Sequence, residues 1–188
     1  MRPAVFIDRD GTINEQLGYI NHISRFILLP GVGEAISLLN EKGFLVVVTS
    51  NQSGVARDYF PIELVDEANN LMKRELARDN AFLDGIYICP HHQNGELAEY
   101  SIACNCRKPK TGLITRAVSD LDIDLKRSYV VGDRILDIEF AHNASLPGIL
   151  VLTGYGMGDL KYILPKKKTK PEYVAKDLLG AVEWILRQ

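Results

Sequence analysis

Two carboxylates stand one residue apart near the start of the chain, in the run Asp8-Arg9-Asp10-Gly11-Thr12. The pair directly follows a short apolar segment, so one side chain can face a ligand while the next turns away. Gly11 lets the backbone bend sharply at this point because it has no side chain. On its own the run is also typical of an ordinary polar turn, so its meaning depends on what lies near it.

Three further segments carry polar groups of other kinds. Residues 49–54 supply hydroxyl and amide donors, which include Ser50, Asn51, Gln52 and Ser53. Residues 107–112 form a basic group that starts with Arg107 and Lys108 and could hold an anion. Residues 132–137 contain the acids Asp133 and Asp137, and Arg134. Separately, these segments predict only a turn, a solvated surface and a charged first turn of a helix.

Combined, the four segments offer acids for a divalent cation, a nucleophile, a hydroxyl and a lysine. Phosphoryl transfer needs in-line attack, a hard cation and donors for the phosphate oxygens. The composition therefore favours a phosphoryl-transfer site. The chain contains no GxxxxGK[ST] run, so a nucleotide-binding loop of that type is not indicated.

The three cysteines gather in one stretch, with the pattern C-x-H-x12-C-x-C. The candidate ligands are Cys89, His91, Cys104 and Cys106. Three thiolates and one imidazole make a closed tetrahedral set that is typical of structural Zn²⁺. His92 is an alternative to His91, and three buried free thiols are the competing interpretation. We expect zinc to fix the loop 89–106 and, with it, the neighbouring Arg107 and Lys108.

Short apolar segments alternate with amphipathic helical patterns along the chain. Strands are predicted at 4–7, 44–48, 86–88, 129–131 and 149–152. They have apolar residues on both faces, as a buried parallel sheet requires. Helices are predicted at about 32–39, 61–76, 113–121, 135–145 and 177–187. Their apolar residues recur at helical spacing.

Repeated β-α-β units predict an α/β fold, a three-layer doubly wound parallel sheet with helices on both faces. No segment between the predicted elements is long enough for an inserted cap domain. Ligands of such folds bind beyond the carboxyl ends of the strands, where the four polar segments lie. The loops at 14–28, 51–60 and 90–107 should rim the site.

The charge balance limits the partners that the chain could have. It carries 22 Lys+Arg and 24 Asp+Glu, a net charge of −2, which favours neither a nucleic-acid partner nor a membrane partner. No apolar run approaches the ~18 residues that span a bilayer, and residues 1–8 lack a signal-peptide core. We expect a single domain over 1–188 in a cytoplasmic monomer.

The order of these motifs resembles that of the haloacid-dehalogenase (HAD) superfamily of phosphatases. The matching segments are Asp8-Arg9-Asp10-Gly11-Thr12, Ser50, Lys108 and Gly132-Asp133. The resemblance implies that Asp8 is a nucleophile that forms an aspartyl-phosphate. It also implies that Asp10 protonates the leaving oxygen and then activates water.

The same resemblance implies a Mg²⁺ cofactor and a set of phosphate donors. Mg²⁺ would be held by the side chains of Asp8 and Asp133 and by the backbone carbonyl of Asp10. Ser50 and Lys108 would bind the phosphoryl oxygens and offset charge in the transition state. Asp137 would support Lys108 or the water shell of the metal.

The zinc loop makes the chain similar to the branch of the superfamily that contains heptose bisphosphate phosphatases and histidinol phosphatases. Segments 14–19 and 50–57 favour the heptose group, although Ser50 stands where that group often has threonine. The implied reaction removes the C7 phosphate of D-glycero-D-manno-heptose 1,7-bisphosphate, on the route to ADP- or GDP-heptose for bacterial surface polysaccharide. Gln16 and Tyr19 would contact the substrate. Arg107, assisted by Arg134, would bind its second phosphate.

Three alternatives compete with this interpretation. Histidinol-phosphate phosphatase shares the chemistry and the zinc, so only substrate preference separates it from the heptose enzymes. A receiver domain carries its acceptor aspartate after the third strand, where this chain has Cys89. A zinc-stabilised binding module would leave the convergence of acids, hydroxyl and lysine unexplained. The favoured prediction is a phosphatase for a small phosphorylated sugar.

Overall fold

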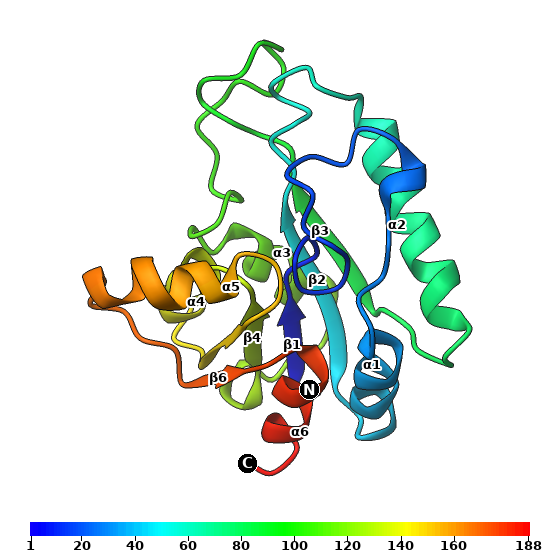
Figure 1. The fold of residues 1–188 in the computed structure, drawn as a ribbon, viewed down its shortest axis with the longest axis vertical. Helices are drawn as coiled ribbons and strands as arrows, with labels where there is room; N and C mark the ends of the chain where they lie inside the picture. The colour runs from blue at the N-terminus through cyan, green and yellow to red at the C-terminus, as the bar shows by residue number, and fades with distance from the viewer.

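Six parallel strands form one sheet in the order β3-β2-β1-β4-β5-β6 (Figure 1). The coordinates are a computed structural model that describes residues 1–188. The strands are β1 (Ala4–Ile7), β2 (Leu45–Asn51), β3 (Gly85–Cys89), β4 (Tyr129–Gly132), β5 (Gly148–Val151) and β6 (Tyr173–Ala175). The first five confirm the predicted strands, and their parallel order confirms the predicted fold class.

Helices cover both faces of the sheet. One face packs against α1 (Val32–Glu41), α2 (Ile62–Ala77) and α6 (Leu178–Ile185). The other packs against α3 (Gly112–Asp120) and α4 (Ile135–Asn143). Side chains alternate between the faces along a strand, so Val46 and Val48 join the first cluster whereas Val47 joins the second. The sheet is therefore buried on both sides.

The elements that the sequence did not predict lie near the carboxyl end of the chain. Strand β6 has three residues and sits at the sheet edge, where Tyr173 stacks on Trp184 with ring centroids 5.0 Å apart. Residues 156–166 form α5 (Gly156–Gly158), one π-turn (η3, Asp159–Ile163) and one 3₁₀ turn (η4, Leu164–Lys166). Each piece is too short to give a clear periodic pattern.

The remaining connections contain little regular structure. Single 3₁₀ turns occur at η1 (Ile23–Arg25) and η2 (Leu125–Arg127). Between β1 and β2 the chain forms only a loop, η1 and α1, so no cap domain interrupts the sheet, as predicted. None of the helices is both long and apolar enough to cross a membrane.

Burial in the central strand gives a direct test of the packing. Phe6 of β1 is fully buried, whereas Phe82 is 53% exposed. We expect Phe6→Ala to lower the free energy of unfolding by about 3–5 kcal/mol, because it removes a large side chain from the core and leaves a cavity. The matched Phe82→Ala substitution should cost less than about 1 kcal/mol. Urea unfolding of both variants measures this difference, and equal losses would contradict the packing.

Candidate active site

A cavity of about 290 Å³ opens beyond the carboxyl ends of β1, β2 and β4. Of the catalytic, magnesium-binding and substrate-binding residues predicted from the sequence, all but Gln52 line it. They are Asp8, Asp10, Gln16, Tyr19, Ser50, Asn51, Ser53, Arg107, Lys108, Asp133 and Arg134. These residues are far apart in the sequence and meet here because β2, β1 and β4 are adjacent in the sheet.

The ammonium group of Lys108 lies at the centre of the buried charges. Its Nζ donates to Asp8 Oδ1 and Asp137 Oδ1, both at 2.6 Å, and to the carbonyl oxygen of Thr49 at 2.9 Å. These bonds use all three hydrogens of the ammonium. Burial acts to lower the pKa of Lys108, but the two carboxylates outweigh burial and raise it above its usual value. Lys108 is therefore a fixed positive charge.

Asp133 completes a cluster of three carboxylates. Single oxygens of Asp8, Asp133 and Asp137 all lie within 4.8 Å of one another. Asp133 is fully buried; its Oδ2 accepts from the backbone N–H of Tyr155 at 2.7 Å. Its Oδ1 has no hydrogen-bond partner although it is buried. A buried acceptor without a donor is costly, so this oxygen is suited to a cation.

Two glycines make room for the Asp133 carboxylate. A Cβ atom at Gly11 would lie 2.3 Å from Asp133 Oδ2, and one at Gly154 would lie 2.2 Å from it. Both positions also have positive φ, +93° and +54°. The backbone therefore approaches the carboxylate more closely than any residue with a side chain would allow.

The electrostatics of the cluster favour a bound divalent cation. Burial raises the pKa of Asp8 to about 7 and that of Asp133 to about 8. For Asp8 the Lys108 charge opposes this rise, and for both groups the neighbouring carboxylates add to it. Three acids face one ammonium, so the site lacks positive charge. Hard oxygen ligands of this kind fit Mg²⁺.

The carboxylate of Asp10 faces the same cavity but is held by different groups. Its Oδ1 accepts from Asn14 Nδ2 at 2.9 Å, and its Oδ2 accepts from Gln52 Nε2 at 2.7 Å. Arg9 Nη2 contacts both oxygens, at 3.2 and 3.0 Å. The backbone carbonyl of Asp10 accepts from Gln16 Nε2 at 3.3 Å. The contacts of Asn14, Gln52 and Arg9 therefore fix the orientation of the Asp10 carboxylate.

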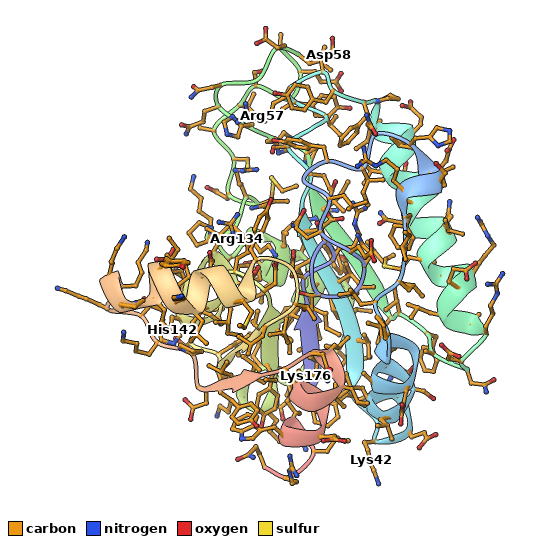
Figure 2. The ribbon with its side chains drawn as sticks, in the orientation of Figure 1. Lys42, Arg57, Asp58, Arg134, His142 and Lys176 are labelled. Carbon is orange, nitrogen blue, oxygen red and sulfur yellow. The ribbon has the colours of Figure 1, made fainter.

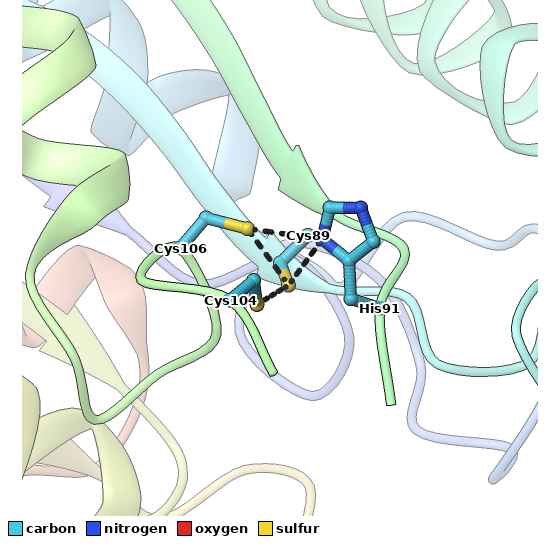
Figure 3. A group of neighbouring side chains, drawn as sticks. All are labelled: Cys89, His91, Cys104 and Cys106. Carbon is cyan, nitrogen blue, oxygen red and sulfur yellow. Dashed lines mark hydrogen bonds between the residues drawn. The ribbon is translucent and has the colours of Figure 1, made fainter. Parts of the chain in front are cut away.

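A second group of side chains that could hold a metal ion ends one residue before Arg107, which lines the cavity (Figure 3). Cys89 Sγ lies 3.5 Å from Cys104 Sγ and 3.1 Å from Cys106 Sγ, and His91 Nδ1 lies 3.3 Å from Cys106 Sγ. The cysteines form no disulfide. Three thiols and one imidazole nitrogen around one point are the donor set of a tetrahedral metal site. His92 points elsewhere, with its Nε2 3.0 Å from Arg57 Nη2.

This chain is similar to known phosphatases over nearly its whole length. A HAD-hydrolase-like family model matches residues 105–181. A D-glycero-D-manno-heptose-1,7-bisphosphate 7-phosphatase of Thermosynechococcus vestitus is 43% identical, with 98% of this chain and 95% of the relative covered. The D-glycero-β-D-manno-heptose-1,7-bisphosphate 7-phosphatase of Haemophilus ducreyi is 40% identical, with 98% of each chain covered. The chain belongs to the HAD-like family of heptose-1,7-bisphosphate 7-phosphatases.

A solved structure supports membership of this phosphatase family. The D,D-heptose 1,7-bisphosphate phosphatase of B. bronchiseptica, complexed with magnesium and phosphate, superimposes with a TM-score of 0.85. It is 31% identical, and the alignment covers 100% of this chain and 99% of that one. The enzyme from Burkholderia thailandensis gives a TM-score of 0.72 at 26% identity, with full coverage of both chains.

Two residues of this family member have contacts that differ from those expected. Gln52 is not among the cavity residues; its amide contacts Asp10 and Ser50 instead. Asn51 lines the cavity, but its side chain is also bonded to the backbone of Lys108, through Lys108 N–H at 3.0 Å and Lys108 C=O at 3.3 Å. The amide of Asn51 therefore holds the Lys108 loop against β2.

The loop after β5 adds cavity residues that sequence reasoning missed. Tyr155 lines the cavity, donates its backbone N–H to Asp133, and lies under the Arg134 guanidinium at 4.8 Å from the ring centroid. Figure 2 shows Arg134 nearer the sheet than Arg57, which lies among the outer loops. Arg9 was also missed as a partner of Asp10. The only sequence signal for Tyr155 was its position between two glycines.

Removal of the central cation tests the charge balance. Lys108→Met leaves the carboxylates of Asp8 and Asp137 without their ammonium, so we expect a loss of about 3–5 kcal/mol in Mg²⁺-free buffer. Added Mg²⁺ should raise the melting temperature of this variant more than that of the wild type. The exposed Lys126→Met substitution is the control, and thermal unfolding with and without Mg²⁺ is the measurement. Equal Mg²⁺ effects in all three proteins would contradict the charge deficit.

Proposed function

We propose that this chain removes the C7 phosphate of D-glycero-D-manno-heptose 1,7-bisphosphate, in the synthesis of nucleotide-activated heptose for bacterial surface polysaccharide. Its similarity to named heptose-bisphosphate phosphatases over nearly the full chain supports the substrate class. The observation that carries the proposal is that two guanidinium groups, Arg107 and Arg134, line the same cavity as Asp8. A second phosphate on the substrate would bind to these two guanidinium groups, whereas the positive charge of the histidinol phosphate ammonium would be repelled by them.

In the proposed mechanism, one oxygen of Asp8 attacks the phosphorus of the C7 phosphate. Lys108 holds Asp8 Oδ1, which leaves the other carboxylate oxygen for the attack. Asp10 gives its proton to the departing O7, and the phosphoryl group is then carried by Asp8 as an acyl phosphate. A water molecule next attacks phosphorus while Asp10 takes a proton from it. Phosphate leaves, and both carboxylates return to their starting states.

The phosphoryl oxygens need donors throughout these steps. Ser50 Oγ accepts from Gln52, so its own hydrogen is free to donate to the phosphate. Lys108 and Ser53 add a positive charge and a second hydroxyl at the same cavity. The side chains of Asp8 and Asp133 and the carbonyl of Asp10 would hold Mg²⁺, which offsets charge on the phosphoryl group when it is bound.

Substrate preference is the test of this function. We expect phosphate release from heptose 1,7-bisphosphate, tried as both anomers, to exceed that from histidinol phosphate by about 100-fold or more in kcat/KM, about 2.7 kcal/mol in transition-state binding. Asp8→Asn serves as the inactive control. A preference for histidinol phosphate would leave the chemistry intact and overturn the proposed substrate.

The second phosphate gives a sharper prediction for one residue. Arg107→Met should lower kcat/KM for the bisphosphate by about 10- to 100-fold, because a charge-assisted hydrogen bond contributes ~1.5–3 kcal/mol. For heptose 7-phosphate, which lacks the second phosphate, the same substitution should lower kcat/KM by less than about threefold, because the hydrogen bond that Arg107 would lose does not form with this substrate. Arg57→Met is the control, since Arg57 does not line this cavity. Equal losses on both substrates would show that Arg107 acts on the fold or on the chemistry.

We also propose that the second cluster holds structural Zn²⁺ through Cys89, His91, Cys104 and Cys106. This site would fix Arg107, whose Nη1 donates to the backbone carbonyl of His91 at 3.3 Å. Zinc with four protein ligands keeps no open position for chemistry. Its proposed role is therefore to hold one wall of the substrate cavity.

The neighbouring histidines allow a matched test of the zinc ligands. We expect His91→Ala to reduce bound zinc below one ion per chain, because it removes one of four ligands. His92→Ala should retain the full zinc content, since His92 contacts Arg57 instead. Elemental analysis of the purified variants measures the content. Full zinc in His91→Ala would refute the proposed ligand set.

Three further expectations stay predictions from the sequence. The chain is proposed to be a single domain over 1–188, to act as a monomer and to work in the cytoplasm. A phosphorylated sugar is the only partner that this function requires.

A further inference from the structure

Gln52 directly follows β2 and does not line the cavity, and only 6% of its surface is exposed. Its backbone N–H donates to the carbonyl of Cys89 at 2.8 Å, so its main chain is tied to the end of β3. Its side-chain nitrogen donates to Asp10 Oδ2 at 2.7 Å and to Ser50 Oγ at 2.8 Å. One amide group therefore joins two residues with different parts in the proposed reaction.

The chemistry of these partners determines which way the amide faces. The nitrogen of Gln52, and not its oxygen, faces Asp10 and donates to Oδ2; this is the orientation that the carboxylate requires once it has given up its proton, because it can then only accept hydrogen bonds. The second hydrogen of the same NH₂ group goes to Ser50 Oγ. Since that oxygen accepts from Gln52, the Ser50 hydroxyl directs its own hydrogen to another acceptor. Ser50 lines the cavity, where a phosphoryl oxygen would be that acceptor.

Arg9 and Asn14 are the remaining partners of the Asp10 carboxylate. Arg9 is buried, and its Nη1 donates to Asn69 Oδ1 of α2 at 3.1 Å. The other terminal nitrogen of Arg9 contacts both Asp10 oxygens. The Gln52 bond is the shortest of the contacts to Asp10, and it alone comes from the strand end that carries Ser50.

We propose that Gln52 is a positioning residue that fixes the Asp10 carboxylate relative to the Ser50 hydroxyl. The inference rests on the proposed function, because it assumes that Asp10 protonates the leaving oxygen while Ser50 binds the phosphoryl group. Because one amide holds both Asp10 and Ser50, the group that protonates the leaving oxygen and the hydroxyl that binds the phosphoryl group are aligned on the same substrate. Loss of the amide should therefore impair proton transfer to the leaving oxygen more than phosphate binding.

Leaving groups of different basicity separate these two effects. The sugar oxygen of heptose bisphosphate needs a proton as it departs, whereas the nitrophenolate of p-nitrophenyl phosphate departs without one. We expect Gln52→Met, in the zinc- and Mg²⁺-loaded protein, to lower kcat/KM for the sugar substrate by about 10- to 100-fold, a part of the ~10²–10⁴-fold that general acid–base catalysis supplies. For p-nitrophenyl phosphate, kcat/KM should fall by less than about threefold, because its leaving group does not need the proton that general acid catalysis supplies.

Two further variants and one inhibition measurement make the result decisive. Gln188→Met is the matched control, because it makes the same substitution at the exposed end of the chain. Gln52→Glu keeps the shape of the side chain but lacks the NH₂ group, and it replaces Gln52→Met if that variant does not fold. Inhibition by inorganic phosphate should change much less than kcat/KM for the sugar substrate in the Gln52 variants, since Ser50 keeps its hydroxyl and phosphate binding does not involve proton transfer to a leaving group.

Asp10→Asn separates failure of this inference from failure of the proposed function. A selective loss on the sugar substrate in both Asp10→Asn and the Gln52 variants supports the positioning role. A selective loss in Asp10→Asn alone overturns the role of Gln52 and leaves the proposed mechanism standing. Equal losses of kcat/KM on both substrates in Asp10→Asn would overturn the role of Asp10 in protonating the leaving oxygen, and the inference with it, because kcat/KM covers only the steps up to departure of the leaving group. Phosphate inhibition that weakens as much as kcat/KM falls for the sugar substrate in the Gln52 variants would assign Gln52 to substrate binding instead.

Discussion

The buried ammonium of Lys108 lies between the carboxylates of Asp8 and Asp137, 2.6 Å from an oxygen of each. Asp133 brings a third carboxylate within 4.8 Å of the other two, and one of its buried oxygens has no donor. Like charges this close are unfavourable in a buried site. Most of the surrounding geometry follows from this imbalance, since the backbone must bring the acids together, hold the single lysine and leave space for a further cation.

The parallel sheet meets these demands with short connections. Asp8 follows β1, Asp133 follows β4, and the Lys108 loop is held to β2 by the side chain of Asn51. These three strands are adjacent, so the three groups converge although Asp8 and Asp133 are distant in sequence. Glycines at 11 and 154 let two backbone segments close over Asp133. The proposed zinc site acts on the outer wall in the same way, through the bond from Arg107 to the carbonyl of His91.

Sequence patterns predicted the parts of this arrangement that depend on local chemistry. The apolar strands, the amphipathic helices, the acids at strand ends and the cysteine spacing are all local, and the structure brings them together as expected. The contacts of Gln52 could not be predicted from the sequence, because the same local pattern, a glutamine after a strand, occurs whether its side chain contacts a ligand or a neighbouring carboxylate. Tyr155 was missed since its part depends on how the loop after β5 folds back over Asp133. Strand β6 was missed because three residues give no periodicity.

Binding of Mg²⁺ to the wild type and to Asp133→Asn tests the charge imbalance most directly. Asn keeps the size of the side chain but removes the negative charge of the Asp133 carboxylate, whose Oδ1 has no hydrogen-bond partner. Isothermal titration calorimetry on the zinc-loaded proteins should detect one Mg²⁺ ion per wild-type chain and at least tenfold weaker binding in Asp133→Asn, about 1.4 kcal/mol or more. Equal affinity in the two proteins would show that the cation is not held by this cluster and would contradict the account.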